Sequence, residues 1–169
     1  ELYEAVYMYE NLLQKSGIRL SYDEDVDANY YINGDRHRMK QVFLNILDNA
    51  AKYGADGKKI DISLRREGGK IVASVRDYGQ GIPEAELPFV KEKFYKGSSK
   101  QRGSGIGLAV TDEIVVLHGG TLDIASTLGA GTTVTITLPA AEAEEALGIT
   151  GAIPKVPETP YTPEPKGDS

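Results

Sequence analysis

Cysteine is absent from the chain, and so is any long apolar stretch. Without cysteine there can be neither disulfides nor thiolate chemistry. No apolar run approaches the roughly 18 residues that a membrane-spanning helix needs, and no signal peptide opens the chain. We therefore expect this segment to be cytoplasmic and to make no direct membrane contact. The chain starts at Glu1 without an initiator Met, which leaves open a longer protein with a membrane anchor upstream.

The chain also lacks an excess of positive charge. Lysine and arginine number 19 against 25 acidic residues, for a formal net charge of −6. This balance argues against a protein that binds nucleic acid through its overall field. The 169 residues suffice for one well-cored domain and leave a remainder too small for a second.

The end of the chain differs in composition from the rest. From residue 140 onward there are six acidic residues and two lysines, and five of the eight prolines lie between Pro154 and Pro165. Proline has no backbone N–H and cannot donate a hydrogen bond to a neighbouring strand. The segment also has too little apolar surface to offset the conformational entropy that it would lose on ordering. We expect a folded domain over residues 1–139 and, over 140–169, a short acidic helix or linker followed by a disordered tail.

Periodic apolar residues predict a mixture of helices and paired strands. Asp35 is placed to cap a helix that Gly54 ends. Because strands come in hairpin pairs with helices inserted between them, we expect an α+β fold. It would be a two-layer sandwich with a mixed, mostly antiparallel sheet covered on one face by helices. The remaining expected elements are helices over 2–15 and 106–118, strands over 18–22 and, as a candidate, 29–32, and hairpins of 60–64 with 71–75 and 121–126 with 132–138.

One side of the expected 36–53 helix carries four residues of possible chemical use. Asn45, Asn49, Lys52 and Tyr53 lie at i, i+4, i+7 and i+8 and share that side. Asparagine has poor helix propensity, and buried amides need partners, so two of them beside an apolar face are costly. Their oxygens suit Mg²⁺, which binds through a few protein oxygens plus substrate phosphates. Two solvated asparagines are an equally good interpretation of this helix alone.

A turn with a carboxylate and two glycines follows an apolar strand. It reads Asp77-Tyr78-Gly79-Gln80-Gly81-Ile82. An aspartate at a strand end can accept from the exocyclic amine of adenine, and the glycines would let the base approach the backbone. A buried charge-assisted hydrogen bond of this kind contributes on the order of 1.5–3 kcal/mol. A plain turn without a ligand explains the same residues.

A glycine-rich segment opens the expected 106–118 helix. Unpaired amides and the positive end of a helix dipole suit phosphate binding. The glycine spacing and the polar stretch before it differ from a Rossmann fingerprint, and the Gly-Lys-Ser/Thr of a P-loop is missing. The segment is Gly103-Ser104-Gly105-Ile106-Gly107-Leu108.

Between the two glycine motifs lies a long connection, residues 83–102, with little regular pattern. A connection of this length in a compact domain is usually a functional lid or disordered. Basic and aromatic residues suit a lid that closes over phosphates, and a solvated basic loop is the alternative. The basic residues are Lys91, Lys93, Lys96, Lys100 and Arg102, and the aromatic ones are Phe89, Phe94 and Tyr95.

In this order, the motifs resemble the catalytic ATP-binding domain of sensor histidine kinases, in the superfamily shared with gyrase, Hsp90 and MutL. Residues 45–53 fit that family's N box, 77–82 its G1 box, 93–96 its F box and 103–108 its G2 box. The closing hairpin, with Gly131-Thr132-Thr133-Val134, also fits. The resemblance covers residues 1 to 139 and implies a Bergerat-type fold that binds ATP and Mg²⁺.

The resemblance implies a role for each matching residue. Asn49 with Asn45 would hold Mg²⁺, Lys52 would reach a phosphate, and Lys96 stands where an arginine that contacts the γ-phosphate is common. Asp77 would accept from adenine, with Thr133 supporting that end through water. Lys91 replaces the first Phe of the family's F-x-x-F pattern. The other nucleotide contacts would be Tyr53, Gly79, Gly81, Ile82, Phe94, Gly103, Ser104, Gly105, Ile106, Gly107 and Leu108.

The resemblance further implies a two-component sensor kinase that transfers the γ-phosphoryl to a histidine. The ATP-hydrolysing relatives carry a Glu at the position of Asn45, and an amide cannot act as a general base. Neither His37 nor His118 has the context of a phosphoacceptor. We therefore expect the acceptor on a separate dimerisation domain, a homodimer, a response regulator downstream, and no autophosphorylation of this chain alone. The alternatives are a serine kinase of the anti-sigma type, a conformational ATPase module and a sensor that only binds ATP.

Overall fold

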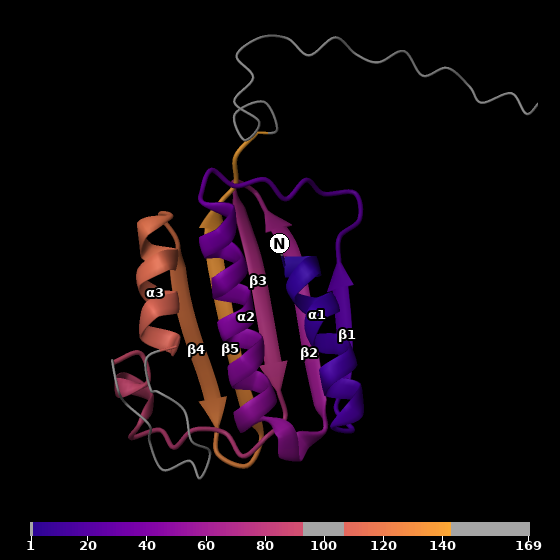
Figure 1. The fold of residues 1–169 in the computed structure, drawn as a ribbon. Helices are drawn as coiled ribbons and strands as arrows, with labels where there is room; N and C mark the ends of the chain where they lie inside the picture. The colour runs from indigo at the N-terminus through magenta and orange to yellow at the C-terminus, as the bar shows by residue number, and fades with distance from the viewer. Residues whose placement is uncertain (1, 93–106, 143–169) are drawn as a thin grey trace, which may run out of the picture.

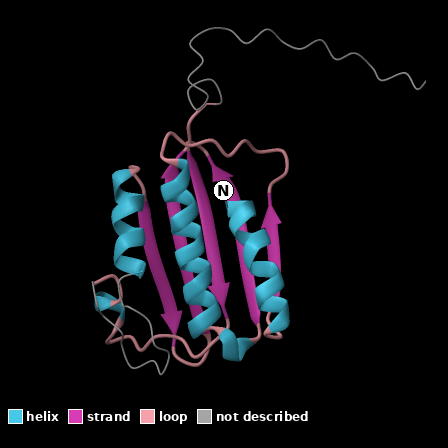
Figure 2. Cartoon of the chain, in the orientation of Figure 1, coloured by secondary structure: helices cyan, strands magenta, loops and turns pink. Residues whose placement is uncertain are grey.

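The computed structural model describes residues 2–92 and 107–142. A five-stranded sheet runs in the order β1-β2-β3-β5-β4, with β1 and β2 parallel and the other neighbours antiparallel. The helices of the described part all cover one face of this sheet (Figures 1 and 2). The expected two-layer α+β sandwich is therefore confirmed. The elements are α1 (Leu2–Lys15), β1 (Arg19–Glu24), α2 (Arg36–Tyr53), η1 (Ala55–Gly57), β2 (Lys59–Glu67), β3 (Lys70–Asp77), η2 (Leu87–Phe89), α3 (Gly107–Leu117), β4 (Thr121–Thr127) and β5 (Gly131–Pro139).

The predicted ends of α2 are confirmed. The Asp35 side chain accepts hydrogen bonds from the backbone N–H groups of His37 and Arg38, at 2.9 and 3.1 Å. These bonds satisfy two donors that have no partner within the helix, and a cap of this kind contributes about 0.5–2 kcal/mol. At the other end the N–H of Gly54 donates to the carbonyl of Ala50. Sequence-local chemistry thus fixes the length of the helix.

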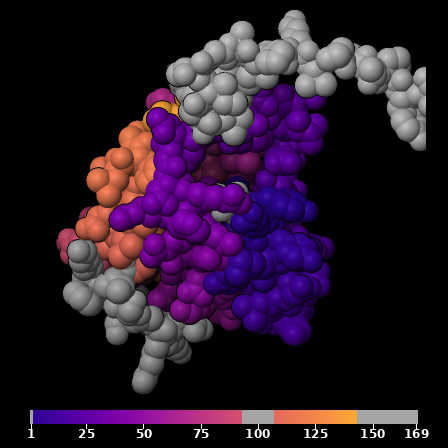
Figure 3. Space-filling model, turned by 45° about the horizontal axis from the view of Figure 1, so that its top comes forward, coloured from indigo at the N-terminus to yellow at the C-terminus, as the bar shows by residue number. Residues whose placement is uncertain are grey.

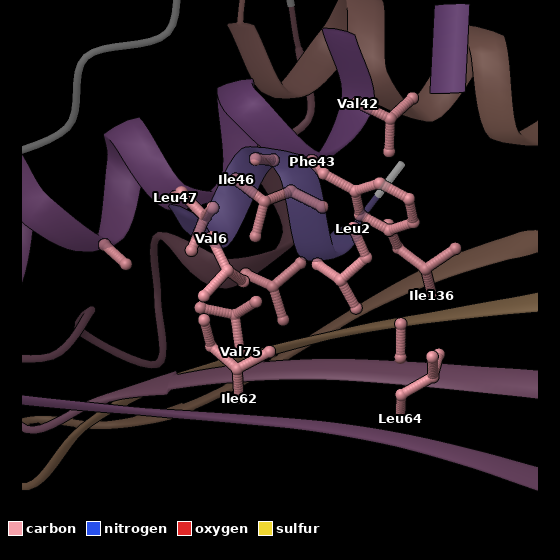
Figure 4. Packing of buried hydrophobic residues seen from close by; sticks show 14 of the residues in the cluster. Leu2, Val6, Val42, Phe43, Ile46, Leu47, Ile62, Leu64, Val75 and Ile136 are labelled. Atoms are coloured by element: carbon pink, nitrogen blue, oxygen red, sulfur yellow. The ribbon is translucent and has the colours of Figure 1, made fainter. Parts of the chain in front are cut away.

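The core lies between the helices and one face of the sheet. Alternate residues of β2 and β3 are buried, as period-2 patterning requires. Figure 4 shows Ile46 and Leu47 of α2 over Ile62 and Val75 of the sheet. Each of the fully buried aliphatic side chains contributes roughly 1.5–3 kcal/mol.

The first two helices adjoin on the covered face. In Figure 3 the side chains of α1 (indigo) meet those of α2 (purple). Glu4 forms ion pairs with Arg36 at 3.1 Å and Lys40 at 3.4 Å. The three side chains are substantially exposed to solvent, which screens the charges, so these pairs contribute little to stability.

The far end of α3 is linked to the start of α2. The N–H of Asp35 donates to Nε2 of His118 at 3.0 Å, and Nδ1 of His118 lies 2.7 Å from the carbonyl of Ile114. Since Nε2 accepts, Nδ1 carries the proton and donates to that carbonyl. A neutral imidazole therefore joins the two helices at this end.

The strand expected over residues 29–32 does not form. The hydroxyl of Tyr30 donates to the carbonyl of Asp25 at 2.8 Å and accepts from the Asp25 N–H at 3.0 Å. Arg66 donates to the carbonyl of Asn29 at 3.0 Å. The Arg66 side chain thus satisfies a backbone carbonyl that a ladder would have used, and the Tyr30 side chain is bonded to the backbone of Asp25. Tyr30 and Ile32 still pack on the core and produce the alternating pattern.

The expected tail lies mostly outside the described residues. Residues 140–142 continue from β5, with the N–H of Ala140 donating to Gly69 and that of Ala141 to Tyr31. The boundary between residues 139 and 140 therefore remains a prediction. No helix among residues 2–92 and 107–142 combines the length and the apolar character that crossing a bilayer requires.

Candidate functional site

A cavity opens at the end of the molecule where α2 ends, β3 ends and α3 begins. Figure 1 shows these three termini at the same edge, below the sheet. The cavity encloses about 810 Å³, including the part open to solvent. Its apolar lining consists of Ile46, Ala50, Val75, Ile82, Pro83, Val90, Leu108, Ile124 and Val134. Its polar lining consists of Asn49, Tyr53, Asp77, Gln80, Glu86 and Thr132.

Asp77, the last residue of β3, is the buried carboxylate of this cavity, with 7% of its surface exposed. Its Oδ1 accepts from the backbone N–H of Gly79 at 3.0 Å and from that of Thr132 at 3.3 Å. Burial raises the pKa of this carboxyl, and the two backbone hydrogen bonds oppose that rise without cancelling it. Its Oδ2 has no hydrogen bond to any residue in the described part of the chain. One oxygen is fixed and the other remains available to a donor on a ligand.

The two glycines after Asp77 allow the backbone to pack closely. A Cβ on Gly79 would lie 2.5 Å from the carbonyl oxygen of Tyr53, at the end of α2. Gly81 has a φ of 75°, and a Cβ there would lie 2.2 Å from the carbonyl oxygen of Thr127. We expected both glycines to make room for a base, but Gly79 does not line the cavity. Gly81 does line it. The pair also joins the turn to α2 on one side and to β4 on the other.

The same turn is fixed from the open face of the sheet. The hydroxyl of Tyr78 donates to a carboxylate oxygen of Asp61. The guanidinium of Arg76 lies 4.6 Å from the centre of the Tyr78 ring, and Nζ of Lys59 lies 5.1 Å from it. Cation–π contacts of this kind are attractive and are weaker at an exposed site than at a buried one. Since Tyr78 follows Asp77 directly, these contacts restrain the backbone that carries the carboxylate.

The four residues predicted along α2 divide into two groups. Asn49 and Tyr53 line the cavity. Lys52 forms an ion pair with Asp48 at 2.8 Å, which raises the pKa of Lys52, and it is directed to solvent with 43% of its side chain exposed. Asn45 lies one turn before Asn49, and its Nδ2 donates to Oγ1 of Thr111 in α3 at 3.2 Å. Of the four predicted residues, Asn49 and Tyr53 border the cavity, and Asn45 and Lys52 do not.

The threonine at the Asp77 end of the cavity is Thr132. Thr133, which we predicted for this place, is absent from the lining. Successive strand residues point to opposite faces, and Val134 shares the cavity face with Thr132. The assignment is therefore corrected by one residue. Period-2 counting back from the apolar Val134 would have found it.

The start of α3 provides the last wall of the cavity. Leu108 lines it, and Gly107 is the first residue of the helix. A Cβ on Gly107 would meet nothing within 4 Å, so the space beside it is open. The other predicted residues of the phosphate loop and the lid lie outside the described residues, and their roles stay predictions. They are Phe94, Lys96, Gly103, Ser104, Gly105 and Ile106.

The described part of the expected lid brings additional residues to the site. Glu86 and Val90 line the cavity from the segment that follows the turn, and nothing in their spacing marked them. Lys91 does not face the cavity. Its Nζ lies 3.5 Å from Asp112 of α3 and donates to the carbonyl of Leu122 at 3.1 Å. Lys91 thus attaches this segment to α3 and β4 by polar contacts.

The residues present suit a hard divalent cation only together with a ligand. The described part of the chain has no group of three His, Cys, Asp or Glu side chains that could hold a metal alone. The amide oxygens of Asn45 and Asn49 lie one turn apart on the same helix. Mg²⁺ binds through one or two protein oxygens when phosphates and water supply the rest. The donor set therefore fits a cation that arrives with a phosphate ligand.

Neither histidine of the chain lines the cavity. Both ring nitrogens of His118 have hydrogen-bond partners. His37 is exposed in the first turn of α2. The expectation that the acceptor lies on a separate domain stays a prediction.

Comparison with known families and proteins shows which proteins this chain resembles. A family model described as "Histidine kinase-, DNA gyrase B-, and HSP90-like ATPase" matches residues 34–142. The chain is 38% identical over 122 residues to sporulation kinase A of Bacillus subtilis (strain 168), a match that covers 72% of this chain and 19% of that protein. It is 35% identical over 117 residues to the signal transduction histidine-protein kinase ArlS of Staphylococcus aureus (strain USA300), covering 66% of this chain and 26% of that protein. The matches thus span about a fifth to a quarter of the curated relatives.

Solved structures show the same architecture. The mycobacterial sensor histidine kinase MprB superposes with a TM-score of 0.69 at 28% identity, over 82% of this chain and 91% of that one. The catalytic domain of the histidine kinase ThkA superposes with a TM-score of 0.72 at 25% identity, over 83% and 92%. The arrangement of helices on one face of a mixed sheet is therefore shared with catalytic domains of this class.

Proposed function

The chain belongs to the histidine kinase-, DNA gyrase B- and HSP90-like ATPase family, and on that premise we propose that it binds ATP with Mg²⁺ and donates the γ-phosphoryl to a histidine of a separate domain. That domain would be the dimerisation and phosphoacceptor domain of a two-component sensor kinase, with a response regulator as the next acceptor. The observation that carries the proposal is the Asp77 carboxylate, which is buried with one oxygen fixed by backbone N–H groups. A domain that uses ATP in this way would work in the cytoplasm.

The purine would occupy the apolar part of the cavity. The free oxygen of Asp77 would accept a hydrogen from the exocyclic amine of adenine, and Thr132 lies beside it to hold a bridging water. Val75, Val134 and Tyr53, which line the cavity, would contact the base. A carboxylate that only accepts discriminates against a purine with a carbonyl at that position, because two acceptors would then face each other. The site should therefore prefer ATP to GTP.

The triphosphate would extend towards the start of α3. Unpaired N–H groups of a helix N-terminus favour negative charge there. Asn49, with Asn45, would hold the cation, which when bound neutralises charge that develops on the phosphates. Lys52 would exchange Asp48 for a phosphate oxygen. The exposed ion pair that it gives up contributes only about 0–1 kcal/mol.

Transfer to a protein nucleophile is favoured over hydrolysis by the identity of residue 45. An asparagine amide has no basicity at neutral pH, so it cannot deprotonate a water molecule. Its Nδ2 moreover donates to Thr111. With no general base at this position, rate acceleration comes from positioning and charge neutralisation.

The proposal is tested in two steps. Calorimetric titration of the chain with ATP and Mg²⁺ should show saturable binding that GTP does not reproduce. Labelled ATP should then transfer label to an added histidine-bearing helical hairpin domain, in an acid-labile form, while the chain alone stays unlabelled. Acid-stable label on a partner would support a serine kinase of the anti-sigma type, and steady ATP hydrolysis without a partner would support a conformational module. Absence of binding at millimolar nucleotide would refute the proposal as a whole.

A further inference from the structure

Thr111 is a polar residue that is completely buried between helices α2 and α3. It lies in the middle of α3 and is 0% exposed. Among the described residues, it and Asp77 are the polar ones that are buried. A buried hydroxyl without partners destabilises the fold, so its hydrogen bonds decide what it contributes.

The hydroxyl of Thr111 has both of its hydrogen-bonding roles assigned. It donates its one hydrogen to the carbonyl of Gly107, four residues earlier, at 2.7 Å. Once that hydrogen is used, the oxygen can only accept. Its second partner is the side chain of Asn45 in α2, at 3.2 Å and 66 residues away in the chain.

This arrangement decides which way the Asn45 amide is turned. An amide has an NH₂ end and an oxygen end, and rotation by 180° exchanges them. Because the Thr111 oxygen is restricted to accepting, Asn45 must present its NH₂ to it. The oxygen, Oδ1, is then the amide end that is not committed to Thr111. It is also the only atom of this amide that can bind a cation.

We propose that Thr111 is a positioning residue for the cation of the nucleotide complex, acting by fixing the Asn45 amide with its oxygen uncommitted. The inference rests on the proposed function, because it needs a cation at Asn45 and Asn49. Without the hydroxyl, the amide can rotate and present NH₂ where an oxygen is needed. Since Asn45 belongs to α2 and Thr111 to α3, the same hydrogen bond also joins the two helices.

The test compares nucleotide affinity with and without the cation. For each variant, the dissociation constant for ATP is measured by calorimetry in excess Mg²⁺ and again in excess EDTA, and the ratio of the two gives the gain from Mg²⁺. We expect Thr111→Val, which keeps the shape but not the hydroxyl, to reduce this gain about three- to tenfold and to leave the affinity in EDTA unchanged. Thr111→Ser keeps the hydroxyl and should keep the gain.

A double-mutant comparison shows whether the effect passes through Asn45. Asn45→Ala should lose a similar part of the gain, and adding Thr111→Val to it should cost nothing further. Thermal unfolding of each variant monitors the fold. If the valine variant does not fold, Thr111→Ala serves in its place.

Three results would overturn the inference while leaving the proposed function standing. These are an unchanged gain from Mg²⁺ in the valine variant, an equal loss with and without Mg²⁺, which is the mark of a structural defect, and full additivity with Asn45→Ala. If the unmodified chain itself shows no gain from Mg²⁺, the metal part of the proposed function fails, and this inference fails with it.

Discussion

The two ends of the cavity are built from different kinds of contact. At the Asp77 end the contacts are made by the backbone. Backbone N–H groups donate to the Asp77 carboxylate, and glycines pack so closely on neighbouring backbone that a Cβ would collide. At the α3 end, side chains make the connections between helices and neighbouring segments. These are Asn45 with Thr111 and Lys91 with Asp112.

The difference has consequences for how each end responds to a ligand. Backbone contacts in a close-packed interior have few alternative arrangements. We therefore expect the Asp77 end to have the same geometry with and without a bound base. Exposed side-chain pairs contribute about 0–1 kcal/mol each and can be exchanged for contacts with a ligand. We therefore expect recognition to be fixed at the first end and adjustment to occur at the second.

The largest effect should follow from changing the acceptor at the rigid end. Asp77→Asn keeps an oxygen for the N–H groups of Gly79 and Thr132, but its NH₂ then faces the adenine amine, donor against donor. The lost bond, of about 1.5–3 kcal/mol, corresponds to a roughly 10- to 100-fold weaker affinity for ATP. Calorimetry measures the affinity, and an unchanged circular dichroism spectrum shows that the fold is kept. Equal affinities would remove Asp77 from the purine site.

The raised pKa of Asp77 predicts opposite pH trends for binding and stability. A donor on the base favours the ionised carboxylate, so ATP affinity should fall as acidification protonates Asp77. This fall should begin above the ordinary value of about 3.9. In the free chain a raised folded-state pKa stabilises the fold most below the unfolded-state value, and this contribution is lost as pH rises through the folded value. The affinity for ATP and the free energy of unfolding are measured across about pH 3.5–7 for the original chain and for Asp77→Asn. The difference between the two proteins at each pH is the contribution of the Asp77 carboxyl. Parallel trends would contradict the assignment.

Two glycine substitutions compare the ends directly. Gly79→Ala places a Cβ 2.5 Å from the Tyr53 carbonyl oxygen, and Gly107→Ala meets nothing within 4 Å. We expect the first to cost about 1–3 kcal/mol of unfolding free energy and the second to leave stability nearly unchanged. Urea denaturation gives both values, and each variant serves as the control of the other. Similar costs at both positions would mean that the two ends are equally rigid.

The smallest effect on stability should come from removing the polar contacts of Lys91, which attach the segment after the 77–82 turn to α3 and β4. Lys91→Met removes the ion pair with Asp112 and the bond to the Leu122 carbonyl. The partners are partly exposed, so the expected loss of stability is at most about 1 kcal/mol. Asp112→Asn is the matched change, and raised salt should reduce the difference between the original chain and both variants. A loss above about 2 kcal/mol would show that this attachment is part of the rigid structure.

Much of the fold could be predicted because its determinants are local. The cap at Asp35, the turn at residues 67–70 and the alternation in β2 and β3 each lie within a few residues of the element that they define. The strand expected over 29–32 failed for the opposite reason. The carbonyl of Asn29 is bonded to Arg66, distant in the chain, and the hydroxyl of Tyr30 is bonded to the backbone of Asp25. No periodic pattern reveals either contact.

The site was predictable in its residue types but less so in its geometry. Asp77, Asn49 and Tyr53 were found because their spacing relative to an apolar strand or helix places them on one side. The register of β5 against the cavity, which selects Thr132 over Thr133, depends on which sheet face the helices cover. The contact between Asn45 and Thr111 depends on how α3 packs on α2, and a single sequence does not contain that information.

The bond between His118 and Asp35 fixes the far end of α3 to the beginning of α2. If that end acts as a pivot, a tilt of the helix would move its first residues most and would also move Thr111 relative to Asn45. Eleven residues span about 16 Å, so a tilt of about 10° would displace Gly107 by about 3 Å and Leu117 hardly at all. That is roughly the length of one hydrogen bond, enough to make or break a contact with a triphosphate. The imidazole of His118, at the opposite end of α3 from the cavity, would in this way set the point about which α3 tilts and so how far Gly107 moves relative to the nucleotide.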